Sequence, residues 1–262
     1  MQGGAGCHFH SRICPARLPV FPLCGGGIGA IMGKSGEGER GVREITGKAA
    51  MERSLVKRFR KELWQPFIAA CKRWRLVTAG DRIAVALDGT AAAAVNCLLL
   101  LELARHSDEP FSLAVLDAGG SPLSAGELGI DALPCPGEPA AAAREWGANR
   151  LAIPDCMSDV TETVFGGMLY EGTLRAFLPL EPDSADPALT LIRPLYCVER
   201  RDILAFCRYN ALPYAPRPDS EAKRKARALL DEMRAASPNV EISIFRAAHQ
   251  VHVDTFPRPL RP

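Results

Sequence analysis

The sequence has no long apolar run and almost no net charge. Its 262 residues include 32 basic and 30 acidic side chains, a formal net charge of +2, so no overall field draws the molecule to a polyanion or a membrane. The apolar run Cys97–Leu101 ends at Glu102 and is too short to cross a bilayer. The chain also lacks the charged start and apolar core of a signal peptide. These absences predict a soluble, cytoplasmic protein without membrane contact.

Cysteines are present, but never in the paired spacing that holds a metal cluster. No two of the nine form a C-x-x-C motif, so zinc-ribbon and iron–sulfur patterns are absent. Cys97 and Cys207 stand in apolar helical runs and are predicted to be buried thiols. The sequence therefore predicts a reducing compartment and no metal site.

The first fifty residues are rich in glycine and proline and show no helical or strand period. We predict that residues 1–50 are a disordered extension or follow from a start codon assigned too early. Gly33–Ser35 has the G-K-S ending of a P-loop, but Ile28 stands where that motif needs a glycine. Four residues have metal-ligand chemistry but no second ligand pair downstream, which favours disorder: Cys7, His8, His10 and Cys14.

From Met51 onward the pattern changes to alternating helices and strands. Apolar residues spaced by four predict one amphipathic helix over Leu55–Trp74, bent at Pro66. Short apolar runs predict five strands, over 82–87, 111–116, 129–133, 150–153 and 189–192. Further helices are predicted over 91–104, 139–146, 158–177, 197–209, 220–235 (capped by Asp219) and 240–251, with an acidic loop over 181–187.

This alternation predicts the fold class. Strand–helix–strand units call for an α/β domain with a doubly wound, mostly parallel sheet and helices on both faces. We place this domain at residues 51–251 and a tail at 252–262. In such a sheet, ligands bind beyond the carboxyl ends of the strands.

The segment Leu191–Ile203 reads LIRPLYCVERRDI. It resembles the IRPL-x-x-V-x-E-x-D-I segment of tRNA 2-thiocytidine synthetases, relatives of the tRNA-lysidine synthetases in the PP-loop ATP-pyrophosphatase superfamily. Glu199 stands one position early, and Arg200 holds the place of the family's glutamate. Three later segments continue the match in order: Pro213-Tyr214, Lys225–Leu230 and Ile244–Ala247. The resemblance covers 51–251 and implies an adenine-nucleotide alpha-hydrolase-like fold and ATP-dependent modification of tRNA.

The family places S-G-G-x-D-S after the first strand, where backbone N–H groups and serine hydroxyls hold phosphate. Here the aligned residues are Asp88, Gly89, Thr90, Ala91, Ala92 and Ala93. One glycine is kept, and a carboxylate stands beside the place of the phosphate, where like charges repel by about 1 kcal/mol even in water. The alanines offer neither hydrogen bonds nor a magnesium ligand. The comparison predicts a degenerate phosphate loop.

A second family motif, G-H-H-x-x-D-x-x-E-T, aligns with PDCMSDVTET after the fourth strand. Asp159, Glu162 and Thr163 match, whereas the glycine and both histidines do not. Acids three apart share a helix face and would form a residual cation or nucleotide site. We favour the alternative, a first helical turn whose acids interact with the helix dipole.

The family's 2-thiocytidine enzymes also hold an iron–sulfur cluster on two C-x-x-C pairs. Only Cys135 lies near the place of the first pair, and Ala215–Asp219 occupies the place of the second. We therefore expect no cluster, and no cluster-dependent thiolation by this chain alone.

Positive charge is concentrated in two segments. Between Met51 and Arg75 eight basic residues stand against two acidic ones, and a second group follows Asp219. Such segments are polyanion contacts or solvated helix faces. The predicted tRNA-binding residues are Lys57, Arg58, Arg60, Lys61, Arg73, Arg75, Lys223 and Arg224. For Trp64 and Trp74 we favour packing on the core over base stacking.

These features favour a non-catalytic relative that keeps the fold and the basic surface and binds tRNA or a protein partner. The first alternative is an active, divergent ATP-dependent enzyme that adenylates or thiolates a tRNA base. The second is a decaying paralogue without a selected function. No catalytic residue and no metal is assigned, ATP and Mg²⁺ are cofactors only of the active alternative, and the oligomeric state stays open.

Overall fold

The computed structural model describes residues 48–108, 110–117, 125 and 131–250. The predicted tail and most of the predicted N-terminal extension lie outside these residues. Helix α1 (Lys48–Lys57) begins three residues before Met51, so its first turn falls within the range predicted as extension.

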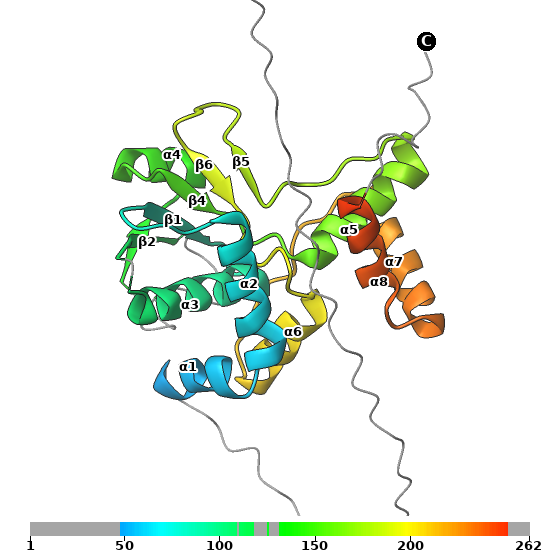
Figure 1. Cartoon of the computed structure of the whole chain (residues 1–262), viewed down its shortest axis with the longest axis horizontal. Helices are drawn as coiled ribbons and strands as arrows, with labels where there is room; N and C mark the ends of the chain where they lie inside the picture. The colour runs from blue at the N-terminus through cyan, green and yellow to red at the C-terminus, as the bar shows by residue number, and fades with distance from the viewer. Residues whose placement is uncertain (1–47, 109, 118–124, 126–130, 251–262) are drawn as a thin grey trace, which may run out of the picture. The chain divides into compact units, whose positions relative to one another are not determined.

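The remaining elements follow in chain order and are labelled in Figure 1. The first half contains η1 (Arg60–Trp64), α2 (Gln65–Trp74), β1 (Arg82–Leu87), α3 (Ala91–His106), β2 (Ser112–Asp117), β3 (Ala132–Pro134), α4 (Pro139–Trp146) and β4 (Arg150–Ala152). The second half contains α5 (Met157–Gly166), η2 (Gly167–Glu171), β5 (Leu180–Pro182), β6 (Thr190–Ile192), α6 (Arg200–Tyr209), α7 (Glu221–Ala236) and α8 (Val240–His249).

The strands form one sheet in the order β3-β2-β1-β4-β6-β5. Every pair is parallel except the edge pair β5–β6, which is antiparallel. The chain leaves β1 toward β2 and β3 and then returns to β4 on the other side of β1, so the connections change direction between β1 and β4. This is the doubly wound arrangement, and it places a ligand crevice at the carboxyl ends of β1 and β4.

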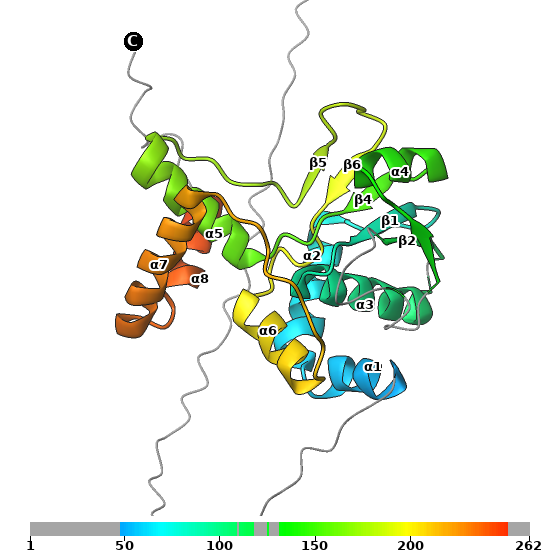
Figure 2. The ribbon, with the colours of Figure 1, turned by 180° about the vertical axis from the view of Figure 1, so that it is seen from behind.

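Helices cover both faces of the sheet, with α3 and α4 on opposite sides (Figures 1 and 2). Alternate residues of β1 point to the two faces because side chains in a strand alternate. Val85 joins a cluster with Leu98 of α3 and Phe206 of α6. Ala84 joins a second cluster with Ala143 of α4. The predicted α/β class with a mostly parallel sheet is confirmed.

The predicted helix over Leu55–Trp74 has the correct buried stripe but is not continuous. Leu63 and Phe67 are fully buried. The α-helix stops at Lys57, passes through the π-helical turn η1, and resumes as α2 with Pro66 in its first turn. Proline is accepted there because the first turn of a helix does not need its backbone N–H. Pro66 therefore lies at the start of α2, and the prediction of one continuous helix over Leu55–Trp74 was wrong.

Three other predicted boundaries need correction. The helix predicted over 158–177 ends at Gly166, and η2 continues only to Glu171, since Gly172 has a positive φ of 63°. The predicted loop at 181–187 begins inside the short edge strand β5. Ser220, not Asp219, caps α7 through a hydrogen bond from the Lys223 N–H. The Asp219 carboxylate accepts instead from Arg227, which removes it from the cap.

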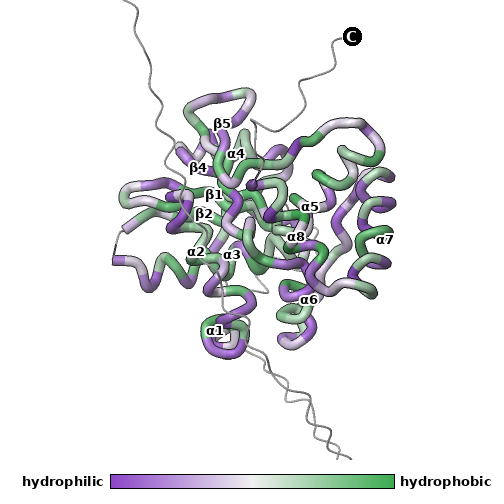
Figure 3. The backbone as a smooth tube through the Cα atoms, turned by 45° about the vertical axis from the view of Figure 1, so that its right-hand side comes forward, coloured by the Kyte–Doolittle hydropathy of each residue, from purple (hydrophilic) through white to green (hydrophobic). Residues whose placement is uncertain are grey.

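The last helices gather around α5. In both views α5, α7 and α8 lie together (Figures 1 and 2). Hydrophilic and hydrophobic residues alternate along the turns of α7 (Figure 3), and only Ala226 and Leu230 of that helix are buried. Within the described residues, no helix has both the length and the apolar character needed to cross a membrane.

Asn96 is a polar residue enclosed by the core. It lies on α3 and is fully buried, and within the described part of the chain neither its amide oxygen nor its amide nitrogen has a hydrogen-bond partner. Asn96→Leu, which keeps the branching of the side chain and replaces its two polar atoms by methyl groups, is expected to raise the free energy of unfolding by about 1 kcal/mol because an unsatisfied buried amide is costly. Urea denaturation measures this change.

Asn210 is the matched control for that substitution. Its amide accepts from the Ser54 hydroxyl at 3.1 Å and donates to the Phe206 carbonyl at 2.9 Å. Asn210→Leu is therefore expected to destabilise by about 1–3 kcal/mol, since the two hydrogen bonds of the side-chain amide are lost. Equal losses in the two variants would show that the Asn96 amide is satisfied in solution.

Candidate functional site

The turn after β1 lies at the carboxyl end of the sheet, where the family's phosphate loop would be. Gly89 has a positive φ of 79°, a conformation that glycine adopts without strain. Thr90 is the N-cap of α3, and its Oγ1 accepts from the Ala93 N–H at 3.2 Å. The sequence thus builds a tight turn followed at once by a helix N-terminus, an arrangement suited to anions.

The Asp88 carboxylate is itself the anion at this turn. Its Oδ1 accepts from the Thr90 N–H at 2.9 Å and from the Thr90 hydroxyl at 2.7 Å. This is an Asx-type turn, which aspartate favours because its side chain bonds the backbone two residues on. The Thr90 N–H, which would donate to a bound phosphate, therefore donates to the Asp88 carboxylate instead.

The segment before α7 closes over the same turn. The Ala215 N–H donates to the Gly89 carbonyl at 2.8 Å. Thr90 and Ala215 form an isolated parallel β-bridge. A cavity of about 230 Å³ remains beside it, lined in part by Thr90, Ala92 and Tyr214. Ala91 and Ala93 are buried, so of the three alanines Ala92 is the partly exposed one.

Asp159, the first matched acid of the second motif, is built into the start of α5. It is buried, and its Oδ2 accepts from the Cys156 N–H at 3.0 Å and from the Cys156 thiol at 3.1 Å, as in a capping box. Thr163 donates its hydroxyl to the Asp159 carbonyl at 2.8 Å. Both contacts are internal to the helix, which agrees with the dipole alternative for this turn.

Arginines surround the two matched acids. Arg200, at the start of α6, bonds Glu162 with both terminal nitrogens and reaches Asp159 Oδ1 at 2.8 Å. Arg227 of α7 bonds Glu162 from the other side, through Nε at 2.8 Å and Nη2 at 2.9 Å. Arg217 lies 3.3 Å from Asp159 Oδ2. We call Asp159, Glu162, Arg200, Arg217 and Arg227 the buried ion-pair cluster.

A neighbouring pair extends this cluster toward β6. Asp155, also buried, accepts from Arg193 Nε at 2.9 Å and from Arg217 Nη2 at 2.7 Å. Arg193 reaches Glu181 at 2.6 Å as well. Sequence reasoning did not single out Asp155, Arg193 or Arg217 as site residues. Arg193 stands in the segment Leu191–Ile203, and Asp155 stands in the motif PDCMSDVTET. A charged residue in an otherwise apolar segment was the signal that could have identified each of them.

The cluster shifts the pKa of Asp159 and of Arg200. Burial alone would raise the pKa of Asp159, but Arg200 and Arg217 hold it below its ordinary value of 3.8. Burial alone would lower the pKa of Arg200, but its bonds to Glu162 raise that pKa above the ordinary value. Asp159 and Glu162 therefore bind guanidinium groups in this structure. In the described part of the chain, no three acidic, histidine or cysteine side chains converge as a metal site.

The cysteines of the described residues form no disulfide with one another, and most of them are buried. Burial raises the pKa of the Cys71 and Cys207 thiols to about 12 and that of Cys197 to about 11. Thiolates, not thiols, act as nucleophiles and cluster ligands. Cys135 is buried and donates weakly to the Gly137 carbonyl at 3.6 Å. This geometry fits structural cysteines.

The predicted tRNA-binding side chains reach solvent but do not form one patch. Lys57, Arg58, Arg60 and Lys61 are exposed from the end of α1 into η1, whereas Arg73 and Arg75 are exposed at the C-terminal end of α2. On α7, Arg224 is exposed and Lys223 is half-buried.

Two of these arginines stack on aromatic rings of the protein. Arg58 lies 4.4 Å from the centroid of the Tyr209 ring, and Arg73 lies 5.0 Å from that of Trp74. Trp64 and Trp74 are partly buried and pack against the main core, with Trp74 meeting Tyr196 edge-on at 5.2 Å. Their position favours the core interpretation of both tryptophans.

The fold is similar to that of a solved tRNA thiolase. The U34-tRNA thiolase NcsA from Methanococcus maripaludis, solved with its 4Fe-4S cluster, superposes with a TM-score of 0.57 over 74% of this chain and 80% of that one. The two sequences are 18% identical, so this likeness concerns the fold alone.

Relatives in sequence are named tRNA-cytidine(32) 2-sulfurtransferase. The protein of Geobacter metallireducens is 34% identical over 117 residues, which are 42% of this chain and 44% of that protein. The protein of Geobacter sulfurreducens is 32% identical with the same coverage. No family model matches. The chain thus matches less than half the length of these relatives, and they confirm its resemblance to the tRNA 2-thiocytidine synthetases of the PP-loop superfamily.

Proposed function

We propose that this chain is a non-catalytic relative of the tRNA 2-thiocytidine synthetases that binds tRNA through its basic surface. The observation that carries the proposal is the Asp88 carboxylate bonded to the Thr90 N–H and hydroxyl. A phosphate placed there would compete with a carboxylate that is covalently part of the turn, and it would be repelled by the same charge.

The buried ion-pair cluster supports the same conclusion. Acids that coordinate Mg²⁺ must offer free oxygens. Both oxygens of Glu162 accept from Arg200 and Arg227, and both oxygens of Asp159 accept from other groups. The residues present do not fit a nucleotide-bound metal, and among the described residues no three cysteine, histidine or acidic side chains converge to hold an iron–sulfur cluster.

The positive surface is the feature left for function. Because Lys57 and Lys61 are exposed and lack acidic partners among the described residues, their charge is available to an RNA phosphate. In this proposal the protein works in the cytoplasm on tRNA. If the protein binds no tRNA, a protein partner is the alternative ligand of this basic surface.

The Lys57→Gln and Lys61→Gln double variant tests the role of the basic surface. If both side chains contact phosphates, the slope of log affinity against log salt falls by about one to two, since each contact contributes about 0.7–0.9. Electrophoretic shifts with tRNA at three salt concentrations measure the slope. The thermal midpoint should stay nearly constant because exposed lysines contribute little to stability.

The charge-preserving double variant, Lys57→Arg with Lys61→Arg, is the matched control. It should keep the wild-type slope, because the effect depends on charge and not on shape. A wild-type protein that binds no tRNA at low salt would contradict the proposed function. Unchanged slopes in the glutamine variant would place the RNA elsewhere on the molecule.

A further inference from the structure

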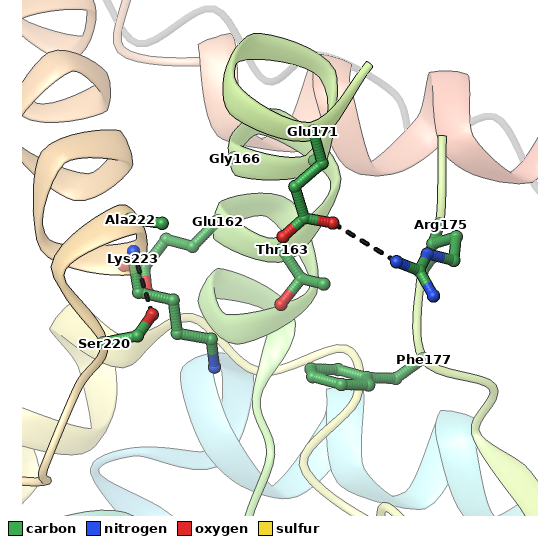
Figure 4. Close-up of a pocket in the computed structure, with 11 residues that line it drawn as sticks. Glu162, Thr163, Gly166, Glu171, Arg175, Phe177, Ser220, Ala222 and Lys223 are labelled. Carbon is green, nitrogen blue, oxygen red and sulfur yellow. Dashed lines mark hydrogen bonds and ion pairs between the residues drawn. The ribbon is translucent and has the colours of Figure 1, made fainter. Parts of the chain in front are cut away.

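A second cavity lies beside α5, next to the buried ion-pair cluster, since Glu162 of that cluster lines it. It measures about 370 Å³ and is bounded by α5, the chain after η2 and the N-terminus of α7. Figure 4 shows Thr163, Arg175, Phe177 and Lys223 around it. Its volume falls within the range of about 300–1,000 Å³ that is usual for small-ligand sites. We call it the α5–α7 groove.

Two cations stand at this groove with little to neutralise them. Lys223 is half-buried, and within the described residues no carboxylate forms an ion pair with it. Arg175 pairs with Glu171 at 3.3 Å, but their side chains are 76% and 53% exposed. An exposed pair of this kind is worth about 1 kcal/mol or less, so a stronger anion can replace Glu171.

The acid at the base of the groove does not oppose an anion. Glu162 lines it, but its carboxylate is bonded by Arg200 and Arg227, as described above. The groove also receives the N-terminus of α7, a helix of sixteen residues whose cap is Ser220. Aligned peptide dipoles place partial positive charge at that end. The local field therefore favours a negative group near Lys223.

An aromatic ring is fixed in the same wall. The Phe177 ring lies 5.5 Å from Lys223 Nζ and 4.9 Å from the guanidinium of the buried Arg193. The Phe177 carbonyl accepts from the Tyr196 hydroxyl at 2.8 Å, and the Arg193 guanidinium donates to the next carbonyl, that of Leu178, at 2.6 Å. These contacts hold the chain at the ring and just after it in place, so stacking on the ring requires little ordering.

The geometry points to a nucleotide site in the α5–α7 groove. One nucleotide of a bound RNA places its phosphate between Lys223 and Arg175, and its base or ribose against Phe177. A phosphate suits a lysine, an arginine and a helix N-terminus together, and a base suits a fixed aromatic ring. The inference rests on the proposed RNA binding and adds a structured contact to the electrostatic one on α1 and η1.

Lys223→Gln and Lys225→Gln form a matched pair for the test. Lys225 lies on the same helix and carries the same charge, but it pairs with Glu221 at 2.8 Å in solvent. Lys223→Gln should weaken tRNA binding about fivefold or more and lower the salt slope by about 0.7–0.9. Lys225→Gln should change affinity less than about twofold. Fluorescence anisotropy at three salt concentrations gives both quantities.

Phe177→Leu separates stacking from charge. It should weaken tRNA binding about fivefold or more without changing the salt slope, because no ion contact is removed. Tyr170→Leu is its control, since Tyr170 is an exposed aromatic residue of η2 that does not line the groove. Unchanged thermal midpoints show that each variant remains folded.

The outcomes distinguish this inference from the proposed function. If the α1–η1 lysine variant weakens tRNA binding while Lys223→Gln matches Lys225→Gln, the groove site is wrong and the proposed function stands. If the wild-type protein binds no tRNA, both are wrong. Poly-glutamate that competes as well as tRNA, with the same dependence on Lys223, would show that the groove recognises carboxylates and would overturn the nucleotide site.

Discussion

Replacing Glu162 with glutamine is expected to lower the free energy of unfolding by about 3 kcal/mol. Glu162 is completely buried and its two oxygens hold both Arg200 and Arg227. The substitution keeps the shape of the side chain but removes the negative charge, so two guanidinium groups lose their counter-ion. Breaking a buried pair costs about 3–5 kcal/mol. The lower end applies here because the arginines are 24% and 29% exposed. Urea denaturation measures the loss.

Glu171→Gln is the matched control for that experiment. It removes the same charge from an acid 53% exposed, whose only ion pair among the described residues is with the exposed Arg175. Its effect should stay within about 0.5 kcal/mol. The double variant Glu162→Gln with Arg200→Gln should be less destabilised than the sum of the single variants, because the groups are in direct contact. A loss below about 1 kcal/mol for Glu162→Gln would show that water or relaxation neutralises the buried ion-pair cluster.

The apolar strands and the buried helix stripe could be predicted from the sequence. The runs that became β1, β2, β4 and β6 are apolar and bounded by turn residues, and a parallel sheet buries both faces of such strands. The stripe from Leu55 to Cys71 predicted which face of α1, η1 and α2 is buried. These patterns repeat over several residues, so single exceptions do not hide them.

The missed elements are short and depend on distant residues. β5 has three residues, including Pro182, and gains its strand geometry by pairing with β6. Unlike the equally short β4 and β6, it does not belong to an apolar run, so the sequence gives no strand signal there. Ser220 caps α7 because Arg227 draws the Asp219 carboxylate away from the helix start. Sequence spacing alone gives both residues a similar preference for the cap.

The site could be predicted in outline but not in its contacts. The Asp88 carboxylate beside Gly89 follows from the motif comparison, and aspartate commonly bonds its own turn. The buried ion-pair cluster joins residues 38 to 65 positions apart. Arg200 was recognised as standing in the place of a glutamate, but only the packing of α6 and α7 against α5 shows that it bonds Glu162. Arg200, at the place of the family's glutamate, thus pairs with Glu162 of the second motif.

Asp88→Ser with Thr90→Gly and Ala92→Asp is expected to improve ATP binding at least about tenfold over the wild-type protein. We expect the wild-type chain to bind ATP with Mg²⁺ more weakly than about 1 mM, a free energy of about 4 kcal/mol. The triple change removes the carboxylate that accepts from the residue 90 N–H, and glycine at position 90 lets a phosphate approach the backbone. Position 92 lines the cavity, so an aspartate there can ligate Mg²⁺. Calorimetric titration measures both affinities.

The variant that keeps Asp88 and carries only Thr90→Gly and Ala92→Asp is the control for that gain. It retains the anion at the turn and adds another, so it should bind ATP no better than the wild-type protein. The gain in the triple variant then belongs to the removal of the Asp88 carboxylate. A triple variant that stays folded and binds no better than wild type would mean that the chain at Ala215, bridged to Thr90, closes the site independently of charge. Micromolar binding by the wild-type chain, or pyrophosphate release when tRNA is added, would instead show an active enzyme and contradict the non-catalytic proposal.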